Sequence, residues 1–96
     1  MLKTVRVEST NFVVLVLEGD IVMENDNSFR RIINELDKST SLPIVIDMDK
    51  VDFVDSWGLG ALVNILCDFQ RRGRRVRINR PRNPNVELVV SHFLSC

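Results

Sequence analysis

The hydrophobic pattern near the N-terminus predicts two strands. Residues 5–8 alternate between valine and a charged side chain, the period of two that is typical of a strand with one solvent-facing side. After a polar turn at Ser9–Asn11, the run Phe12–Leu17 is apolar throughout, and Gly19 follows as its expected end. An unbroken apolar run predicts a central strand that is buried on both faces.

The pattern then changes to helical spacing and back. Apolar residues at i, i+3, i+4 and i+7 predict a first helix, with possible N-cap residues between Asn25 and Ser28. Pro43–Met48 predicts a third strand, with its proline at the start, where no ladder donor is lost. The apolar stripe of the helix consists of Phe29, Ile32, Ile33 and Leu36.

Three more elements follow. Apolar spacing from Leu59 onward predicts a helix over residues 57–72, with Gly73 just past its end. Residues 75–78 alternate as a fourth strand. Asn83-Pro84 then supplies an N-cap and a first-turn proline for a short last helix.

The predicted order is therefore ββαβαβα, which indicates an α/β fold. Helical connections join strands two and three and strands three and four, so these strands should be parallel neighbours. The first two strands should form an antiparallel hairpin. We expect a single domain over residues 1–96, with a mixed, mostly parallel sheet of about four strands and helices packed on it.

Composition narrows the functional classes. The chain is 45% hydrophobic and 27% charged, which is typical of a folded globular protein. It has no apolar run of the ~20 residues that a membrane span needs and no secretory signal, so we expect a cytoplasmic protein without a membrane span. Cys67, Cys96 and the single histidine, His92, have no metal-ligand spacing. We therefore expect no metal site and no cofactor, and an exposed His92.

Charge is distributed unevenly although the net charge is zero. Residues 1–50 carry 6 basic and 9 acidic side chains, whereas residues 51–96 carry 7 and 4. This polarity favours oriented docking of a protein partner over general nucleic-acid binding.

The junction between the third strand and the second helix carries the most distinctive residues, VDFVDSWGLGALV at 51–63. Ser56 stands where a helix N-cap is expected, because its hydroxyl can accept a hydrogen bond from a free first-turn amide. A helix N-terminus also accommodates a phosphate, so Ser56 has a functional interpretation as well. Gly58 and Gly60 weaken a helix start, and they indicate close approach of a strand or of another protein.

Residues 47–62, DMDKVDFVDSWGLGAL, resemble the signature of STAS domains, the family of bacterial anti-sigma factor antagonists. That signature combines a strand, a V-x-F-x-D-S motif and a G-L-G-x-L helix start, and the predicted element order is similar to the family's. The resemblance implies that Ser56 is phosphorylated by an anti-sigma factor that is also a serine kinase, of the GHKL ATPase type. The unphosphorylated form would bind this partner, the phosphorylated form would release it, and a phosphatase would reset the switch.

The resemblance also implies a partner-binding surface, and two departures from the family pattern affect it. The family's G-E-L-D stretch reads Gly19–Val22 here and lacks its second acid, and Trp57 replaces a small hydroxyl residue. We expect Trp57 at the surface as a binding anchor, with packing on the core as the alternative. Many members continue into a further C-terminal helix, which we expect to be absent. The implied partner-binding residues are Asp20, Asp55, Ser56, Trp57, Gly58, Leu59 and Gly60.

Two enzyme classes fit less well. The stretch 47–51 matches the D-x-D-x-V of haloacid-dehalogenase-like phosphatases, but no lysine follows Lys50 and the remaining acids lie too close in sequence to complete that site. A serine hydrolase would need a G-x-S-x-G elbow, which the chain lacks. We therefore expect a binding module and not an enzyme.

Seven arginines lie within residues 71–82 and leave three interpretations open. They could form a solvated surface, dock an acidic protein, or contact the phosphates of nucleic acid or an anionic membrane. Because no aromatic residues are interleaved with them, we expect no specific nucleic-acid binding. A non-switching STAS accessory subunit of a transport or other multiprotein complex, in which Ser56 is only a cap, is the alternative to the switch.

Overall fold

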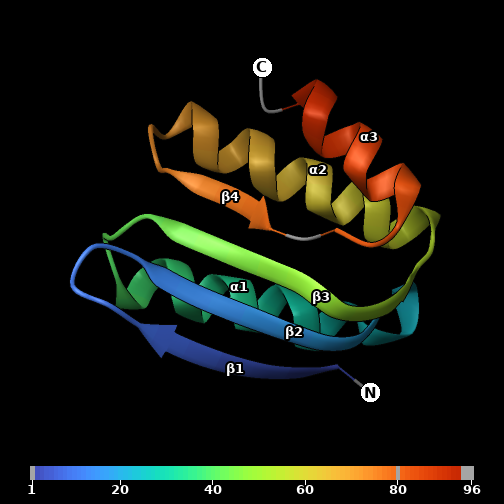
Figure 1. Ribbon diagram of the computed structural model, residues 1–96, viewed down its shortest axis with the longest axis horizontal. Helices are drawn as coiled ribbons and strands as arrows, with labels where there is room; N and C mark the ends of the chain where they lie inside the picture. The colour runs from blue at the N-terminus through green and yellow to red at the C-terminus, as the bar shows by residue number, and fades with distance from the viewer. Residues whose placement is uncertain (1, 80, 94–96) are drawn as a thin grey trace.

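The computed structural model describes residues 2–79 and 81–93, with side chains described through residue 88. The predicted ββαβαβα order is confirmed, with one additional 3-10 turn, η1, before the first helix (Figure 1). The elements are β1 (Lys3–Glu8), β2 (Val13–Ile21), η1 (Met23–Asn25), α1 (Asp26–Ser39), β3 (Ile44–Val54), α2 (Ser56–Arg71), β4 (Val76–Asn79) and α3 (Pro84–Phe93).

The four strands form one mixed sheet in the order β1-β2-β3-β4, as predicted. β1 pairs with β2 antiparallel, and β2, β3 and β4 are parallel. The register places Val14 opposite Val7 on one side and Val45 on the other. Val45 in turn lies opposite Arg77.

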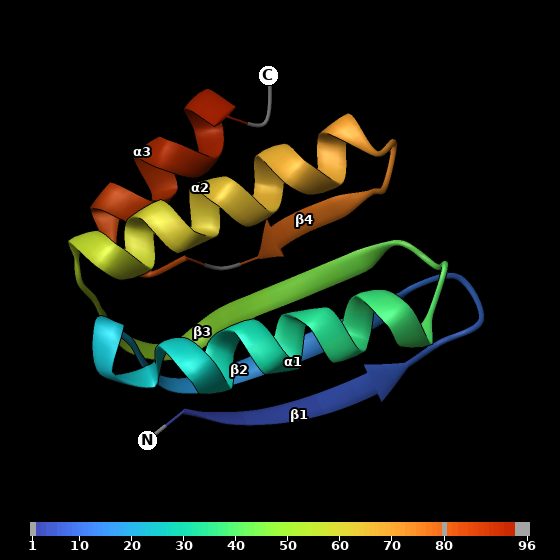
Figure 2. The same cartoon turned by 180° about the vertical axis from the view of Figure 1, so that it is seen from behind.

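Both crossover helices cover the same face of the sheet. In Figure 1 the strands lie in front of α1 and α2, and in Figure 2 the two helices lie in front of the strands, with α3 against α2. Strands that follow one another in the sheet and are joined by right-handed crossovers must place their helices on the same side. The core therefore forms between this face and the helices.

The core side chains alternate along the strands and recur every three or four residues along the helices. Val13, Leu15 and Leu17 of β2 are each at most 3% exposed, and Phe29 of α1 is fully buried against them. Burying such a side chain contributes ~1.5–3 kcal/mol, so this layer dominates the stability of the domain. From α2, the contributors are Leu62, Leu66 and Phe69.

The prediction that the second strand is buried on both faces is wrong. Val14 and Val16 are only half-buried, because no described helix covers the opposite face of the sheet. Gly19 also does not end the strand, since β2 continues to Ile21. Gly19 has φ 116° and lies at a register shift between β2 and β3, a conformation that glycine adopts without strain.

Two predicted helix boundaries agree with the structure. Gly73 follows α2 with φ 73°, as expected for a glycine just past a helix end, and the Asn83 side chain accepts a hydrogen bond from the Asn85 amide at 2.9 Å as the cap of α3. No side-chain cap bond forms at Asn25 before α1. The predictions that concern Cys96 and the His92 side chain lie outside the described part of the chain.

Candidate functional site

The start of α2 is held by Asp55 and not by Ser56. Asp55 is the N-cap residue, and its Oδ1 accepts a hydrogen bond from the Gly58 amide at 2.7 Å. Its Oδ2 accepts a second hydrogen bond, from the Met23 amide at 3.1 Å, and its own amide donates to the Ile21 carbonyl at 3.3 Å. The carboxylate thus ties the first turn of α2 to the end of β2. The expected cap at Ser56 is therefore wrong, because the acid one residue earlier takes that position.

Ser56 is the first residue of α2, and its side chain is exposed. Among the described residues, its hydroxyl makes no hydrogen bond. The first amides of any helix have no carbonyl partner within the helix and attract negative charge. A group attached to the Ser56 hydroxyl would thus leave the cap in place and lie beside a positive helix end.

The two glycines of the first turns have different surroundings. A side-chain carbon built on Gly58 would lie 2.0 Å from the Ile21 carbonyl oxygen, so only glycine allows α2 to start this close to β2. Gly60 is exposed, and a carbon built on it would meet no atom within 4 Å. Close approach of a strand therefore explains Gly58, and Gly60 lies open to solvent.

Trp57 packs partly on the core, which is the alternative to the surface anchor that we expected, and its role in partner binding stays a prediction. Its ring is half-buried and meets Phe29 of α1 edge to face, with centroids 6.3 Å apart and planes at 79°. Leu59 is half-buried against the same core. The bulk of Trp57 extends the interface between α1 and α2, which the small residue expected from the family pattern could not do.

Asp20 reaches the same edge of the sheet through β2. It is half-buried and directly precedes Ile21, whose carbonyl accepts the Asp55 amide. Its own carbonyl accepts a hydrogen bond from the Asn25 side chain at 2.8 Å. The structure therefore brings Asp20 close to the Asp55–Gly60 turn, while its role in partner binding stays a prediction.

Met23 is the residue of this site that the sequence did not indicate. It is 64% exposed, and its amide donates to Asp55, so it lies next to the start of α2. A methionine in an irregular turn has no periodic pattern that could distinguish it from a core residue. Only its exposure in the folded chain reveals it as a contact candidate.

Two arginines of the basic run are structural ties, of which Arg74 is half-buried and Arg72 is exposed. Arg74 donates to Asp37 Oδ1 at 2.9 Å and to the backbone carbonyls of Thr40 and Leu42. Arg72 also bonds Asp37, at 2.9 Å, and this hydrogen bond raises the pKa of the Arg72 guanidinium, which stays charged. Both contacts fasten the end of α1 to the turn after α2.

The remaining described arginines divide into a tied and a free group. Arg82 donates to the Asp49 carbonyl at 3.1 Å. Arg71, Arg75 and Arg77 are exposed. Arg75 and Arg77 line an open groove at the amino ends of β3 and β4, together with Phe12 and other apolar residues.

The two acids of the D-x-D stretch have different surroundings. Asp47 is 5% exposed in β3, and its Oδ1 accepts the Asp49 amide at 3.0 Å, whereas Asp49 is exposed. Within residues 2–79 and 81–93, no three histidine, cysteine or acidic side chains come together as a metal site. In the same ranges, no helix is long and apolar enough to cross a bilayer.

The sequence of this chain matches the family model of the STAS domain over residues 3–90. A search among curated proteins finds no match. The match covers the sheet and the start of α2, including the whole junction from Asp55 to Gly60.

Solved structures of the same fold include two anti-sigma factor antagonists. The antagonist from Mycobacterium paratuberculosis has a TM-score of 0.72 and 18% identity, and the match covers 99% of this chain and 81% of that one. The antagonist SpoIIAA, in its unphosphorylated form, has a TM-score of 0.69 and 17% identity, with 95% and 82% covered.

A third similar structure is part of a much larger protein. The murine anion transporter Slc26a9 has a TM-score of 0.70 and 19% identity, and the match covers 88% of this chain but only 14% of the transporter. Identities this low establish a shared fold and leave the activity open.

Proposed function

This chain belongs to the STAS domain family, and we propose that it works as a phosphorylation-controlled binding module of the anti-sigma factor antagonist kind. In the proposed switch, the unphosphorylated chain binds an anti-sigma factor that is also a serine kinase. Phosphate on Ser56 releases this partner, and a phosphatase restores binding. The chain itself binds and does not catalyse.

The observation that carries this proposal is the division of roles between Asp55 and Ser56. Asp55 caps α2 with its carboxylate, so the exposed Ser56 hydroxyl is available for modification without loss of the cap. A phosphate at this position would be stabilised by the positive end of α2 within the free chain. The free chain would therefore tolerate the phosphate, and the phosphate would weaken only the binding of the partner.

The cost to the complex follows from charge and desolvation. A phosphoserine carries ~1.5–2 negative charges at neutral pH. Buried in a protein contact without a matching cation, such a charge costs several kcal/mol. A loss of ~3 kcal/mol corresponds to ~100-fold weaker binding, which is enough for a switch.

The surface available to a partner consists of the exposed residues around Ser56. Gly60 and Met23 are exposed there, and Gly60 allows a partner backbone to approach the helix closely. Asp20 lies at the same edge. In this proposal Met23 is the binding anchor that the sequence suggested Trp57 to be. Trp57 packs on Phe29 and Gly58 lies against the Ile21 carbonyl, so both hold the start of α2 in place beneath the exposed residues.

The experiment isolates the partner and follows the phosphate. The tagged chain is used to capture its partner from its native host, and the partner is identified by mass spectrometry. The complex is then incubated with Mg-ATP, the phosphate is mapped, and the affinity of the partner is measured for wild type, Ser56→Ala, Ser56→Asp and the phosphorylated chain.

We expect phosphate on Ser56, unchanged binding by Ser56→Ala and at least tenfold weaker binding by the phosphorylated chain, with Ser56→Asp weakened in the same direction. Met23→Ser should weaken binding without changing the site of phosphorylation, and Leu88→Ser, an equally exposed apolar residue on α3, is the matched control. Phosphate on another residue, or equal affinity of all forms, would contradict the switch.

A non-switching accessory module is the second candidate function. The likeness to a segment of Slc26a9, an anion transporter, supports it, because there the same fold forms a small part of a larger protein. Under this alternative the captured partner is bound equally by all Ser56 variants.

A further inference from the structure

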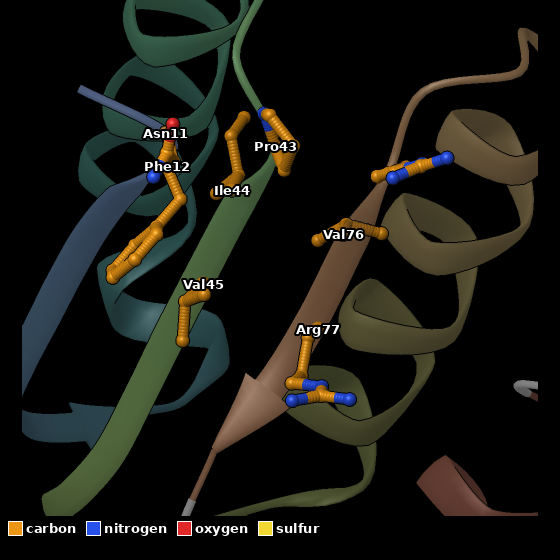
Figure 3. Close-up of a pocket in the computed structure, with 8 residues that line it drawn as sticks. Asn11, Phe12, Pro43, Ile44, Val45, Val76 and Arg77 are labelled. Carbon is orange, nitrogen blue, oxygen red and sulfur yellow. The ribbon is translucent and has the colours of Figure 1, made fainter. Parts of the chain in front are cut away.

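The amino ends of β2, β3 and β4 form an open groove on the face of the sheet that no described helix covers. Figure 3 shows Phe12 beside β3, Val45 on β3 and Arg77 on β4, with α1 and α2 behind the strands. The groove has a volume of about 460 Å³, and Phe12 is 42% exposed. The groove therefore presents an aromatic side chain to solvent, beside a cation.

The register of the strands explains why the groove is apolar on one side and cationic on the other. One row across the four strands consists of Val7, Val14, Val45 and Arg77. Val7 is 52% exposed, and Val14 and Val45 are half-buried. The row therefore begins as an apolar surface on β1, β2 and β3 and ends at a guanidinium on the edge strand β4.

Arg75 and Arg77 stand on the same side of the edge strand, and both line the groove. Successive side chains of a strand point to opposite faces, and Val76 between them packs against the core. The Arg75 carbonyl accepts a hydrogen bond from the Ile44 amide at 3.0 Å, which fixes the backbone there. Both arginines are exposed, and within the described part of the chain neither guanidinium makes a hydrogen bond or an ion pair.

The positive charge of the groove is open to a ligand. Glu8, the acid at this end of β1, is paired with Arg6. Asp47 lies two residues beyond Val45 in β3 but is only 5% exposed. The charge that faces solvent at this end is therefore that of the two groove arginines. Arginine forms strong, often bidentate hydrogen bonds with carboxylates, so the groove is complementary to a ligand with carboxylates beside an apolar group.

Acidic side chains beyond the groove limit the size of its occupant. Glu18 is exposed in β2, four residues after Val14. Asp49 is exposed in β3, four residues after Val45. Four residues of a strand span ~13 Å, which exceeds the ~8 Å over which salt screens exposed charges. A short anionic segment at the amino end is thus screened from these acids, whereas a membrane or nucleic-acid surface laid along the sheet would meet them.

We propose that this groove binds a short acidic segment of a second protein partner. One large apolar side chain of the segment lies on Phe12 and Val45, and carboxylates on either side of it contact Arg75 and Arg77. The groove is at the amino ends of the parallel strands, whereas Ser56 follows the carboxyl end of β3. The chain can therefore hold this partner while the other end of the sheet binds or releases a different one.

The test follows the backbone amides of the full, ¹⁵N-labelled chain by NMR during titration with three capped peptides. The acidic peptide acetyl-EEFEE-amide should shift the amides of residues 44–45 and 75–77 with a saturating curve. The peptide acetyl-EEGEE-amide lacks the apolar side chain and should bind at least about fivefold more weakly. The basic peptide acetyl-KKFKK-amide should leave these amides unchanged, because its charge is repelled by the two arginines.

Charge reversal tests the arginines directly. A chain with both Arg75→Glu and Arg77→Glu should lose the response to acetyl-EEFEE-amide and gain one to acetyl-KKFKK-amide. Arg71→Glu, at the exposed end of α2, is the matched control and should change the affinity for the acidic peptide less than about twofold. Each spectrum also shows whether the variant is folded. If the double variant unfolds, Arg77→Gln removes one charge and should weaken acidic-peptide binding at least about threefold.

A pair of serine variants tests the apolar contact. Phe12→Ser should weaken the binding of acetyl-EEFEE-amide at least about fivefold, because the peptide side chain loses the ring on which it lies. Leu88→Ser, which removes an exposed apolar side chain from α3, should change this binding less than about twofold.

Three results would overturn the proposal: no shift with the acidic peptide up to about 10 mM, shifts that centre on residues 55–60, or an equal response to all three peptides. Vesicles of phosphatidylglycerol and duplex DNA are further probes. Tighter, arginine-dependent binding of either one than of the peptide would assign the groove to that surface instead. The proposal does not depend on Ser56, so failure of the phosphorylation switch leaves this test unaffected.

Discussion

Replacing Gly58 by alanine should destabilise the domain, whereas the same change at Gly60 should stabilise it. A side-chain carbon at Gly58 would lie 2.0 Å from the Ile21 carbonyl oxygen and 2.9 Å from its carbonyl carbon. At Gly60 no atom lies within 4 Å. The two residues are in the same helix, two positions apart, so each is a control for the other.

The magnitude follows from what must move. The obstacle at Gly58 is backbone of a central strand, so α2 has to retreat by roughly 1.5 Å to reach an ordinary contact distance. That shift costs ~1–3 kcal/mol as overpacking and a further ~1–3 kcal/mol if the bonds of Asp55 to Ile21 and Met23 are lost. The better helix propensity of alanine offsets only ~1 kcal/mol of this loss. We expect a net loss of about 3 kcal/mol at Gly58 and a gain of about 1 kcal/mol at Gly60.

Urea and thermal unfolding, followed by circular dichroism, measure both effects. For a domain of this size, 1 kcal/mol shifts Tm by ~4–8 °C. Gly58→Ala should therefore lower Tm by more than ~10 °C, and Gly60→Ala should raise it by ~4–8 °C. An unchanged or higher Tm for Gly58→Ala would refute the close contact between α2 and β2.

Three further changes test the surroundings of the same turn. Asp55→Ala should cost ~2–3 kcal/mol in urea unfolding because two amides lose their acceptor, whereas Ser56→Ala should stay within ~0.5 kcal/mol; similar losses would show that Ser56 shares the capping. Trp57→Ala should lower the free energy of unfolding by ~2 kcal/mol because its contact with Phe29 is lost, and an unchanged Tm would show that the ring does not pack on the core. Arg74→Met should cost about 3 kcal/mol because a mostly buried acid and several carbonyls lose their donor, and a neutral effect would mean that water replaces it.

The sequence predicted the order and direction of the strands because these depend on strong, local signals. Apolar spacing separated helices from strands, and the presence of a helix between strands required parallel pairing. The positions of Gly73 and Asn83 followed from the backbone geometry that helix ends need, and the structure has both as predicted.

The sequence could not reveal which face of the sheet stays bare. Phe12–Leu17 is apolar throughout, and such a run is compatible with burial on both faces. Whether the second face is covered depends on the side to which α1 and α2 cross, which is a property of the strand order. The arginines show the same limit. Arg74 is a structural tie only because the fold brings it to Asp37 near the end of α1, 37 residues away in sequence.

The candidate site shows why a motif locates a function better than it assigns residues within it. The pair Asp55-Ser56 is compatible with a cap at either residue, because both side chains offer an oxygen acceptor to first-turn amides. The choice between them depends on the Met23 amide, which is 32 residues from Asp55 in sequence but donates to it in the folded chain. A carboxylate has two oxygens and accepts from the Met23 and Gly58 amides together, whereas a serine hydroxyl has one oxygen. A serine at the cap would exchange its hydroxyl for phosphate oxygens as the acceptor of the helix amide when phosphorylated, and the modification would then change the start of the helix as well as binding. With the cap at Asp55, the charge on Ser56 can change while α2 stays fixed, and this separation is what a reversible binding switch requires.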